Sequence, residues 1–139
     1  MNTNLHLVFA AGKCTEAFAF YETVFKSKVS FCMKYGDAPP GTPVTEDMKD
    51  LVMHTSMPLG SLTLMGCDAP KHMGVPTFGG FHISVDMPDE DEVKRVFEQL
   101  QAGGKVAMPL SKTFWSPLFG MCTDRFGVEW MVSVPGPQM

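Results

Sequence analysis

The chain has 139 residues, 45% of them apolar, which suits one ordinary domain or two small modules that share a core. Its net charge of −4 and the lack of a Lys/Arg cluster argue against a nucleic-acid partner. No apolar run approaches the roughly 20 residues of a membrane helix, and the first residues lack the features of a signal peptide, so we expect a cytoplasmic protein with no membrane partner.

The first half of the chain predicts a strand, a helix and three strands. Alternating residues predict a strand at Leu5–Ala10, with His6 opposite the bulkiest side chains. A helix follows from Cys14 or Thr15, with an apolar stripe at helical spacing. Residues 37–50 are acidic and proline-rich, which predicts a loop there. Three further strands are expected, the last two joined by a turn at 58–61: Lys28–Tyr35, Leu51–Met57 and Leu62–Gly66.

The second half repeats this order after a predicted linker or lid at Cys67–Phe78. A strand at Phe81–Val85 places Phe81, Ile83 and Val85 on one face and His82 on the other. Pro88 and the acids after it open a helix that ends at Gly103–Gly104. Three strands are expected to complete the half: Lys105–Leu110, Phe119–Thr123 and Val128–Val134.

A type I turn is predicted between the last two strands. Asp124 and Gly127 occupy its first and fourth positions, where Asp bonds forward and Gly supplies a positive φ. In the strand that follows, Val128, Trp130 and Val132 share one face and Glu129 lies on the other. One face of this hairpin is therefore expected to be core, and the other carries an acid.

The two halves match when they are offset by 76 residues, which places His6 on His82. The same offset aligns four apolar positions of the two helices, Ala17, Phe20, Tyr21 and Val24 with Val93, Val96, Phe97 and Leu100. We infer an internal duplication.

Cysteine and methionine content is informative as well. The four cysteines form no Cys-x-x-Cys pair, which argues against a zinc ribbon or a dithiol motif and favours reduced thiols. Cys122 is expected to be buried and inert, because nothing near it in sequence would lower its pKa. Twelve methionines favour adaptable core packing over a soft, apolar binding cavity.

A metal site is one hypothesis for the face opposite the helices. His6, His82 and Glu129 are all expected there, and two modules side by side would curl that face into a cup. Two His and one carboxylate with open positions suit a catalytic divalent ion such as Zn²⁺, Ni²⁺, Mn²⁺ or Fe²⁺. The alternative is that no metal binds, the histidines being hydrogen-bonded wall residues and Glu129 a solvated acid.

Other candidates would line a cup for an organic ligand. His54 lies in the third strand, but the alternation around it does not decide which face it occupies. Phe114 and Trp115 are candidate aromatic walls, with core packing as the alternative for Phe114. Trp115 needs a hydrogen-bond partner for its indole N–H if it is buried.

Segments spread over nearly the whole chain carry a family resemblance: Cys14-Thr-Glu-Ala-Phe-Ala-Phe-Tyr21, Tyr35-Gly-Asp-Ala-Pro39, His54, Asp68-Ala-Pro70, Gly103-Gly104, Met108-Pro-Leu110, Thr113-Phe-Trp115 and Phe119-Gly-Met-Cys-Thr-Asp-Arg-Phe-Gly-Val-Glu-Trp-Met-Val132. With these segments the chain resembles the vicinal oxygen chelate superfamily of glyoxalase, bleomycin-resistance and extradiol dioxygenase proteins, and within it the PhnB-like branch. Thr-Phe-Trp and Asp-Arg-Phe-Gly are specific to that branch.

The resemblance implies an α+β fold in which tandem β-α-β-β-β modules form a curved mixed sheet with a ligand cup. One domain at 1–139 would hold modules at about 4–66 and 79–135, with a linker at 67–78. It also implies a homodimer.

Metal-using relatives take a His from the first strand, which His6 matches. Their second His corresponds to Gly80 and their Glu to Met131, each two residues from His82 and Glu129. A shift of two residues moves a side chain roughly 6.6 Å along a strand. Met131 thereby becomes a candidate cup residue.

Two functions follow as hypotheses, and the resemblance leaves open whether the chain is an enzyme. The first is a protein that binds a small organic molecule in an aromatic, Met-lined cup containing His54, Phe114, Trp115 and Met131. The second is a metal-dependent lyase or dioxygenase that uses His6, His82 and Glu129. PhnB-like chains are also often labelled as resembling 3-demethylubiquinone methyltransferases, but this sequence has no glycine-rich strand-to-helix turn to hold the methyl-donor cofactor.

Overall fold

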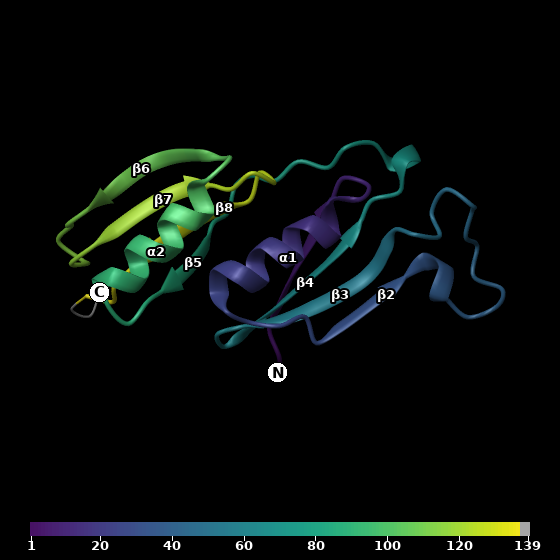
Figure 1. Cartoon of the computed structure of the whole chain (residues 1–139), viewed down its shortest axis with the longest axis horizontal. Coiled ribbons are helices and arrows are strands. Elements are labelled where there is room, and N and C mark those ends of the chain that lie inside the picture. Colours follow the sequence, from purple (N-terminus) through teal and green to yellow (C-terminus); the bar gives the residue numbers. More distant parts are fainter. Residues whose placement is uncertain (137–139) are drawn as a thin grey trace. The chain divides into compact units, whose positions relative to one another are not determined.

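The computed structural model describes residues 1–136 and divides the chain into two compact units, Met1–Pro76 and the residues from Thr77 onward. Each unit is a four-stranded mixed sheet with one helix packed on one face (Figure 1). The fold is therefore α+β, as expected from the sequence. No helix within residues 1–136 is both long and apolar enough to cross a membrane.

In the first unit the strand order is β1-β4-β3-β2, with β1 parallel to β4 and the other pairs antiparallel. Helix α1 contacts β1, β3 and β4. Short 3₁₀ turns lie at Tyr35–Asp37 and Lys71–Met73. The regular elements are β1 Asn4–Phe9, α1 Lys13–Phe25, β2 Phe31–Lys34, β3 Val52–Leu59 and β4 Leu62–Asp68.

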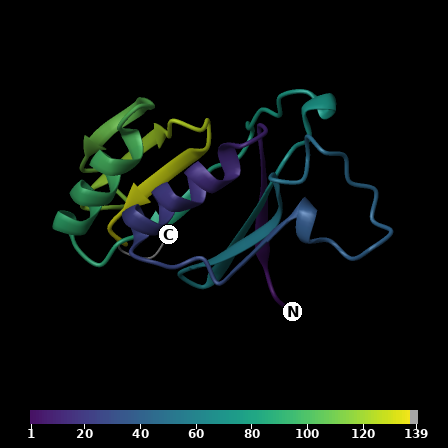
Figure 2. The ribbon, with the colours of Figure 1, turned by 45° about the vertical axis from the view of Figure 1, so that its right-hand side comes forward.

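The second unit has the equivalent order β5-β8-β7-β6, with β5 parallel to β8 and the other pairs antiparallel. Helix α2 packs on β6, β7 and β8 (Figure 2). The elements are β5 Ile83–Asp86, α2 Glu90–Gln101, β6 Lys105–Ser111, β7 Phe119–Thr123 and β8 Glu129–Ser133.

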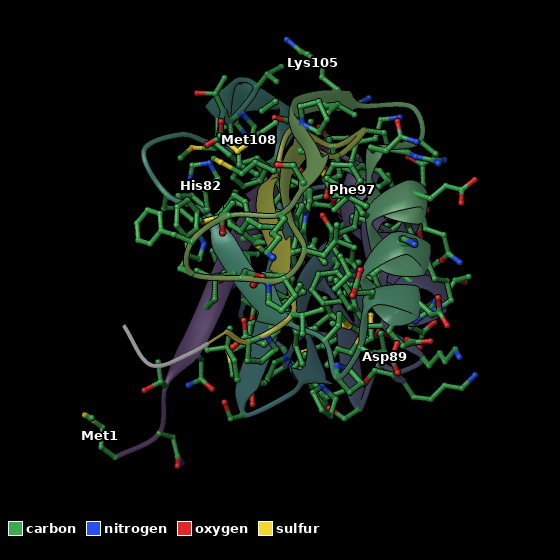
Figure 3. All side chains as sticks on the ribbon, turned by 90° about the vertical axis from the view of Figure 1, so that its left-hand side faces the viewer. Met1, His82, Asp89, Phe97, Lys105 and Met108 are labelled. Carbon is green, nitrogen blue, oxygen red and sulfur yellow. The ribbon has the colours of Figure 1, made fainter. Side chains whose placement is uncertain are left out.

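The internal duplication is confirmed by this shared topology. The equivalent helix positions Ala17 and Val93 are both buried, and so are Tyr21 and Phe97. Figure 3 shows Phe97 directed from α2 toward its sheet, with His82 on the side of the sheet away from α2. The two sheets thus present equivalent faces, one covered by a helix and one that we call the open face.

Strand alternation correctly predicted which face is core. In β1, Leu7 and Phe9 are buried whereas His6 is exposed. Val128 just before β8 is buried, and so are Trp130 and Val132 within it, whereas Glu129 is only half-buried. This follows because successive strand side chains point to opposite faces, and only one face receives the helix.

Several predicted boundaries were wrong. β5 begins at Ile83, so His82 and Phe81 precede the strand, and Phe81 is 36% exposed instead of packed in the core. Gly80 just before them has φ 77°, a left-handed conformation that ends regular pairing at this point. β2 is shorter than expected at both ends, because it begins only at Phe31 and is followed by a 3₁₀ helix at Tyr35–Asp37. The Asp37 carboxylate of that helix accepts a hydrogen bond from Lys34 N.

The hairpin between β3 and β4 is tighter than predicted. Leu59 pairs with Leu62, so only Gly60 and Ser61 form the loop, and Pro58 lies within β3. Gly60 has φ 57°, as two-residue hairpin loops require. β4 continues to Asp68 and so takes the first two residues of the predicted linker.

Most methionines are not core residues. Met48 and Met57 are the ones that are buried among residues 1–136. Met65, Met121 and Met131 are half-buried on strands, at positions alternate to the core side chains. The core-packing interpretation therefore fits only two of the methionines that the structure describes.

Candidate functional site

A stacked pair of histidines lies on the open face of the first sheet. The rings of His6 in β1 and His54 in β3 have centroids 6.0 Å apart and an interplanar angle of 22°. Phe31 of β2 also contacts His54, with ring centroids 6.0 Å apart. The sequence left the face of His54 undecided, and the structure places it opposite buried Thr55 and Met57. The β2–β3 register shifts between Met33 and Lys34, so Val52 before His54 departs from this alternation.

Partial burial lowers the pKa of His6, and the nearby charge of His54 lowers it further. Both causes disfavour the imidazolium form, the first by desolvation and the second by repulsion between like charges. His6 is therefore held in its neutral form over a wider pH range than a solvated histidine.

The three predicted metal ligands come from both units. His6 belongs to the first unit, whereas His82 lies just before β5 and Glu129 begins β8 in the second. Nowhere in residues 1–136 are three His, Cys, Asp or Glu side chains grouped so that they could hold a metal ion. The set of His6, His82 and Glu129 stays a prediction.

A cavity of about 280 Å³ opens on the face of the second sheet that α2 leaves uncovered. Strands β5, β7 and β8 supply its floor, and the segments at 115–116 and 134–136 supply its wall. It contains two of the predicted cup residues, Trp115 and Met131. The complete lining is Ser84, Asp86, Trp115, Ser116, Phe119, Met131, Ser133, Val134, Pro135 and Gly136.

The Thr-Phe-Trp-Ser segment is fastened to the sheet by its own hydroxyl groups. Thr113 Oγ1 accepts hydrogen bonds from Trp115 N at 3.3 Å and Ser116 N at 3.0 Å. Buried Ser116 Oγ donates to Val134 O at 2.6 Å, beyond the end of β8. A Cβ on Gly136 would lie 1.8 Å from Trp115 O, so only glycine permits this close approach. The cavity wall is thus held in place before any ligand arrives.

Trp115 and Phe119 form an edge-to-face pair at the cavity, with ring centroids 5.3 Å apart and an interplanar angle of 74°. Phe114 packs its ring against Trp115 at 4.7 Å but is 90% exposed and does not line the cavity. It is therefore neither a cavity wall nor a core residue. His54 belongs to the first unit and lies outside this cavity.

The indole N–H of Trp115 was expected to have a partner if buried. Trp115 is half-buried, and within residues 1–136 its ring nitrogen donates no hydrogen bond. The group is left for water or a ligand.

Sequence reasoning missed Asp86 and Ser133. They are paired in the parallel β5–β8 ladder, and Ser133 Oγ lies 3.1 Å from Asp86 Oδ1. The alternation of Ser84 and Asp86 with Ile83 and Val85 could have placed Asp86 on the open face. It could not have indicated that Trp115 comes to the same place, because the two are far apart in sequence.

Two buried cysteines have thiol pKa values raised above the ordinary value. Burial raises the pKa of Cys122 to about 12, with a further contribution from the charge of Asp124, and Cys122 is buried as expected. Burial likewise raises the pKa of the Cys14 thiol. Neither is suited to act as a nucleophile, which requires the thiolate.

Comparison with known proteins places this geometry in a family. The model described as the Glyoxalase/Bleomycin resistance protein/Dioxygenase superfamily matches residues 4–132. Protein YjdN of Escherichia coli strain K12 is 30% identical over 132 residues, which cover 89% of each chain.

Two solved structures agree over almost the whole chain. Protein PA1353 from Pseudomonas aeruginosa is 36% identical with a TM-score of 0.86, covering 97% of this chain and 98% of that one. The PhnB protein from Bacillus cereus is 28% identical with a TM-score of 0.74, covering 96% and 98% of the two chains.

Proposed function

Because the chain belongs to the Glyoxalase/Bleomycin resistance protein/Dioxygenase superfamily, in its PhnB-like branch, we propose that it binds a small organic molecule in the cavity of its second unit. One observation carries the proposal: the cavity of about 280 Å³ that Trp115, Phe119 and Met131 line. Such a volume approaches the lower end of the range for small-molecule sites, about 300 Å³. Apolar walls with a few polar groups are the usual composition of these sites.

The chemistry of the lining supports an aromatic or otherwise apolar ligand body. The edge-to-face pair of Trp115 and Phe119 offers ring surface, and the Met131 thioether is polarizable and adaptable. Ser84 and Ser133 add hydroxyl groups that could fix a polar substituent. Because Thr113 and Ser116 already hold the wall in place, little conformational entropy is lost on binding.

A neutral aromatic probe tests the proposal. Naphthylmethanol should shift the indole N–H resonance of Trp115 in a saturable way, and Trp115→Ala should weaken its binding about tenfold, measured by calorimetry. Phe114→Ala is the matched control, because Phe114 is the exposed neighbour that does not line the cavity. Equal affinity for the parent protein and Trp115→Ala would refute the proposal.

A second candidate function is a metal-dependent lyase or dioxygenase that uses His6, His82 and Glu129. The observation in its favour is His6, which projects from β1 on the open face and whose lowered pKa maintains the neutral imidazole that binds metals. Such an ion would act as a Lewis acid on substrate oxygens. The metal content of the purified protein separates the two candidates, because only the second requires a bound ion.

We further propose that the chain forms a homodimer. Each sheet has an unpaired edge on either side, β1 and β2 in one unit and β5 and β6 in the other, and exposed apolar side chains such as Phe31 and Val106 occur on both units. Edges and apolar surface of this kind are commonly covered by a partner. Light scattering after size exclusion should give twice the 15.3 kDa of one chain, and a mass of one chain would contradict the proposal.

A further inference from the structure

We propose that the cavity of the second unit selects organic cations, namely molecules with an aromatic body and a protonated amine. This inference rests on the proposed function and adds the charge of the ligand. Its basis is that Asp86 is the one charged residue among the ten that line the cavity. Among residues 1–136, no lysine or arginine lines it to receive an anionic group.

Asp86 is oriented for such a role by the strand beside it. The Ser133 hydroxyl donates to Asp86 Oδ1 at 3.1 Å, and Met87 N donates to Ser133 O at 2.8 Å, so side chain and backbone are both tied to β8. Within residues 1–136, Asp86 Oδ2 accepts no hydrogen bond. One carboxylate oxygen is thus held in place, and the other remains available to a charged donor.

The aromatic wall adds a second attraction for a cation. An ammonium group near a tryptophan face is attracted by the negative potential of the ring, and Trp115 lines the same cavity as Asp86. The net charge of −4 on the chain favours the approach of cations over anions. A neutral ligand would gain from the rings but would leave the carboxylate without a charged partner.

A matched pair of probes tests this inference. Naphthylmethylammonium should bind about tenfold more tightly than naphthylmethanol in calorimetry at neutral pH and low salt. Asp86→Asn keeps the shape of the side chain and should remove that preference, because it weakens the binding of naphthylmethylammonium far more than that of naphthylmethanol. Asp91→Asn is the control, because it makes the same charge change on the exposed first turn of α2, away from the cavity.

The possible outcomes separate the inference from the proposed function. Equal binding of the two probes, or a cation preference that persists in Asp86→Asn, would overturn the selection of cations while leaving the binding function in place. If Asp91→Asn lost the cation preference equally, the preference would come from the overall charge of the chain, and the inference would also be overturned. Failure of both probes to bind would overturn the proposed function too. Unchanged thermal unfolding of Asp86→Asn would show that the variant folds.

Discussion

Trp130 Nε1 donates a hydrogen bond to Asp124 Oδ2 at 2.9 Å, and both residues are buried, with exposures of 0% and 3%. The other oxygen of this carboxylate accepts from Phe126 N at 2.8 Å and Val128 N at 3.0 Å. Asp124 therefore holds the turn between β7 and β8 and also satisfies the indole in the core below it. Arg125 beside it donates to Ala102 O, at the C-terminus of α2. The Asp-Arg-Phe-Gly segment joins the helix, the turn and the core.

Asp124→Ala should lower the free energy of unfolding by about 2–4 kcal/mol, because three donors lose a charged acceptor and the indole N–H is buried without one. Urea unfolding measures this change. Asp50→Ala, on an exposed loop of the first unit, is expected to change stability by less than about 0.5 kcal/mol. A loss as small as that for Asp124→Ala would contradict the role given to its carboxylate.

His54→Gln should raise the pKa of His6, because it removes the nearby positive charge that disfavours the imidazolium form. The pKa should still lie below 6.5, since burial is the larger cause and remains. An NMR titration of the His6 ring measures it. Phe31→Leu serves as control, because it removes a ring contact of His54 but no charge.

The lowered pKa of His6 also has a consequence for stability. Between its lowered folded-state pKa and the ordinary value of 6.5, the unfolded chain binds more protons at His6 than the folded chain does. Its contribution to stability is therefore present above pH 6.5 and is lost as the pH falls. A shallower decline of stability in acid is expected for His54→Gln, whereas an unchanged profile would argue against the coupling.

The raised pKa of Cys122 should make the folded chain less stable as the pH rises, the opposite of the effect of His6. Its pKa of about 12 in the folded chain exceeds the value of 9.0 for a free thiol, so the folded chain retains a proton that the unfolded chain releases. Stability should therefore decline from about pH 9 upward, by roughly 1 kcal/mol at pH 10 from this group. Cys122→Ala should show a shallower decline over this range in urea unfolding. Identical slopes would contradict the shift.

Metal analysis by atomic emission of the purified protein distinguishes the two candidate functions. A lyase or dioxygenase that uses His6, His82 and Glu129 requires about one transition-metal ion per chain, lost in His6→Ala. His72→Ala is the matched control, since His72 is an exposed histidine of the first unit. Metal content that His6→Ala leaves unchanged would exclude the role given to His6. Stoichiometric metal lost only in His6→Ala would favour catalysis over binding alone.

Residue patterns along the chain are enough to predict the repeated order of strand, helix and three strands, the core face of β1 and β8, and the turn at Asp124. These features depend on local periodicity and turn chemistry, which are properties of neighbouring residues. The resemblance to the PhnB-like branch followed from segments spread along the chain, and the family match confirmed it.

Which side chains meet depends on how the strands pair and pack in three dimensions. His54 stacks on His6 because β1 and β3 both pair with β4, which brings side chains from the open faces of two strands together, and alternation within one strand cannot reveal such pairing. Asp86, Trp115 and Ser133 line one cavity because β5 pairs with β8 and the Thr113–Ser116 turn is hydrogen-bonded to the end of β8. Contacts between residues so distant along the chain depend on strand pairing and packing, which local sequence patterns do not encode.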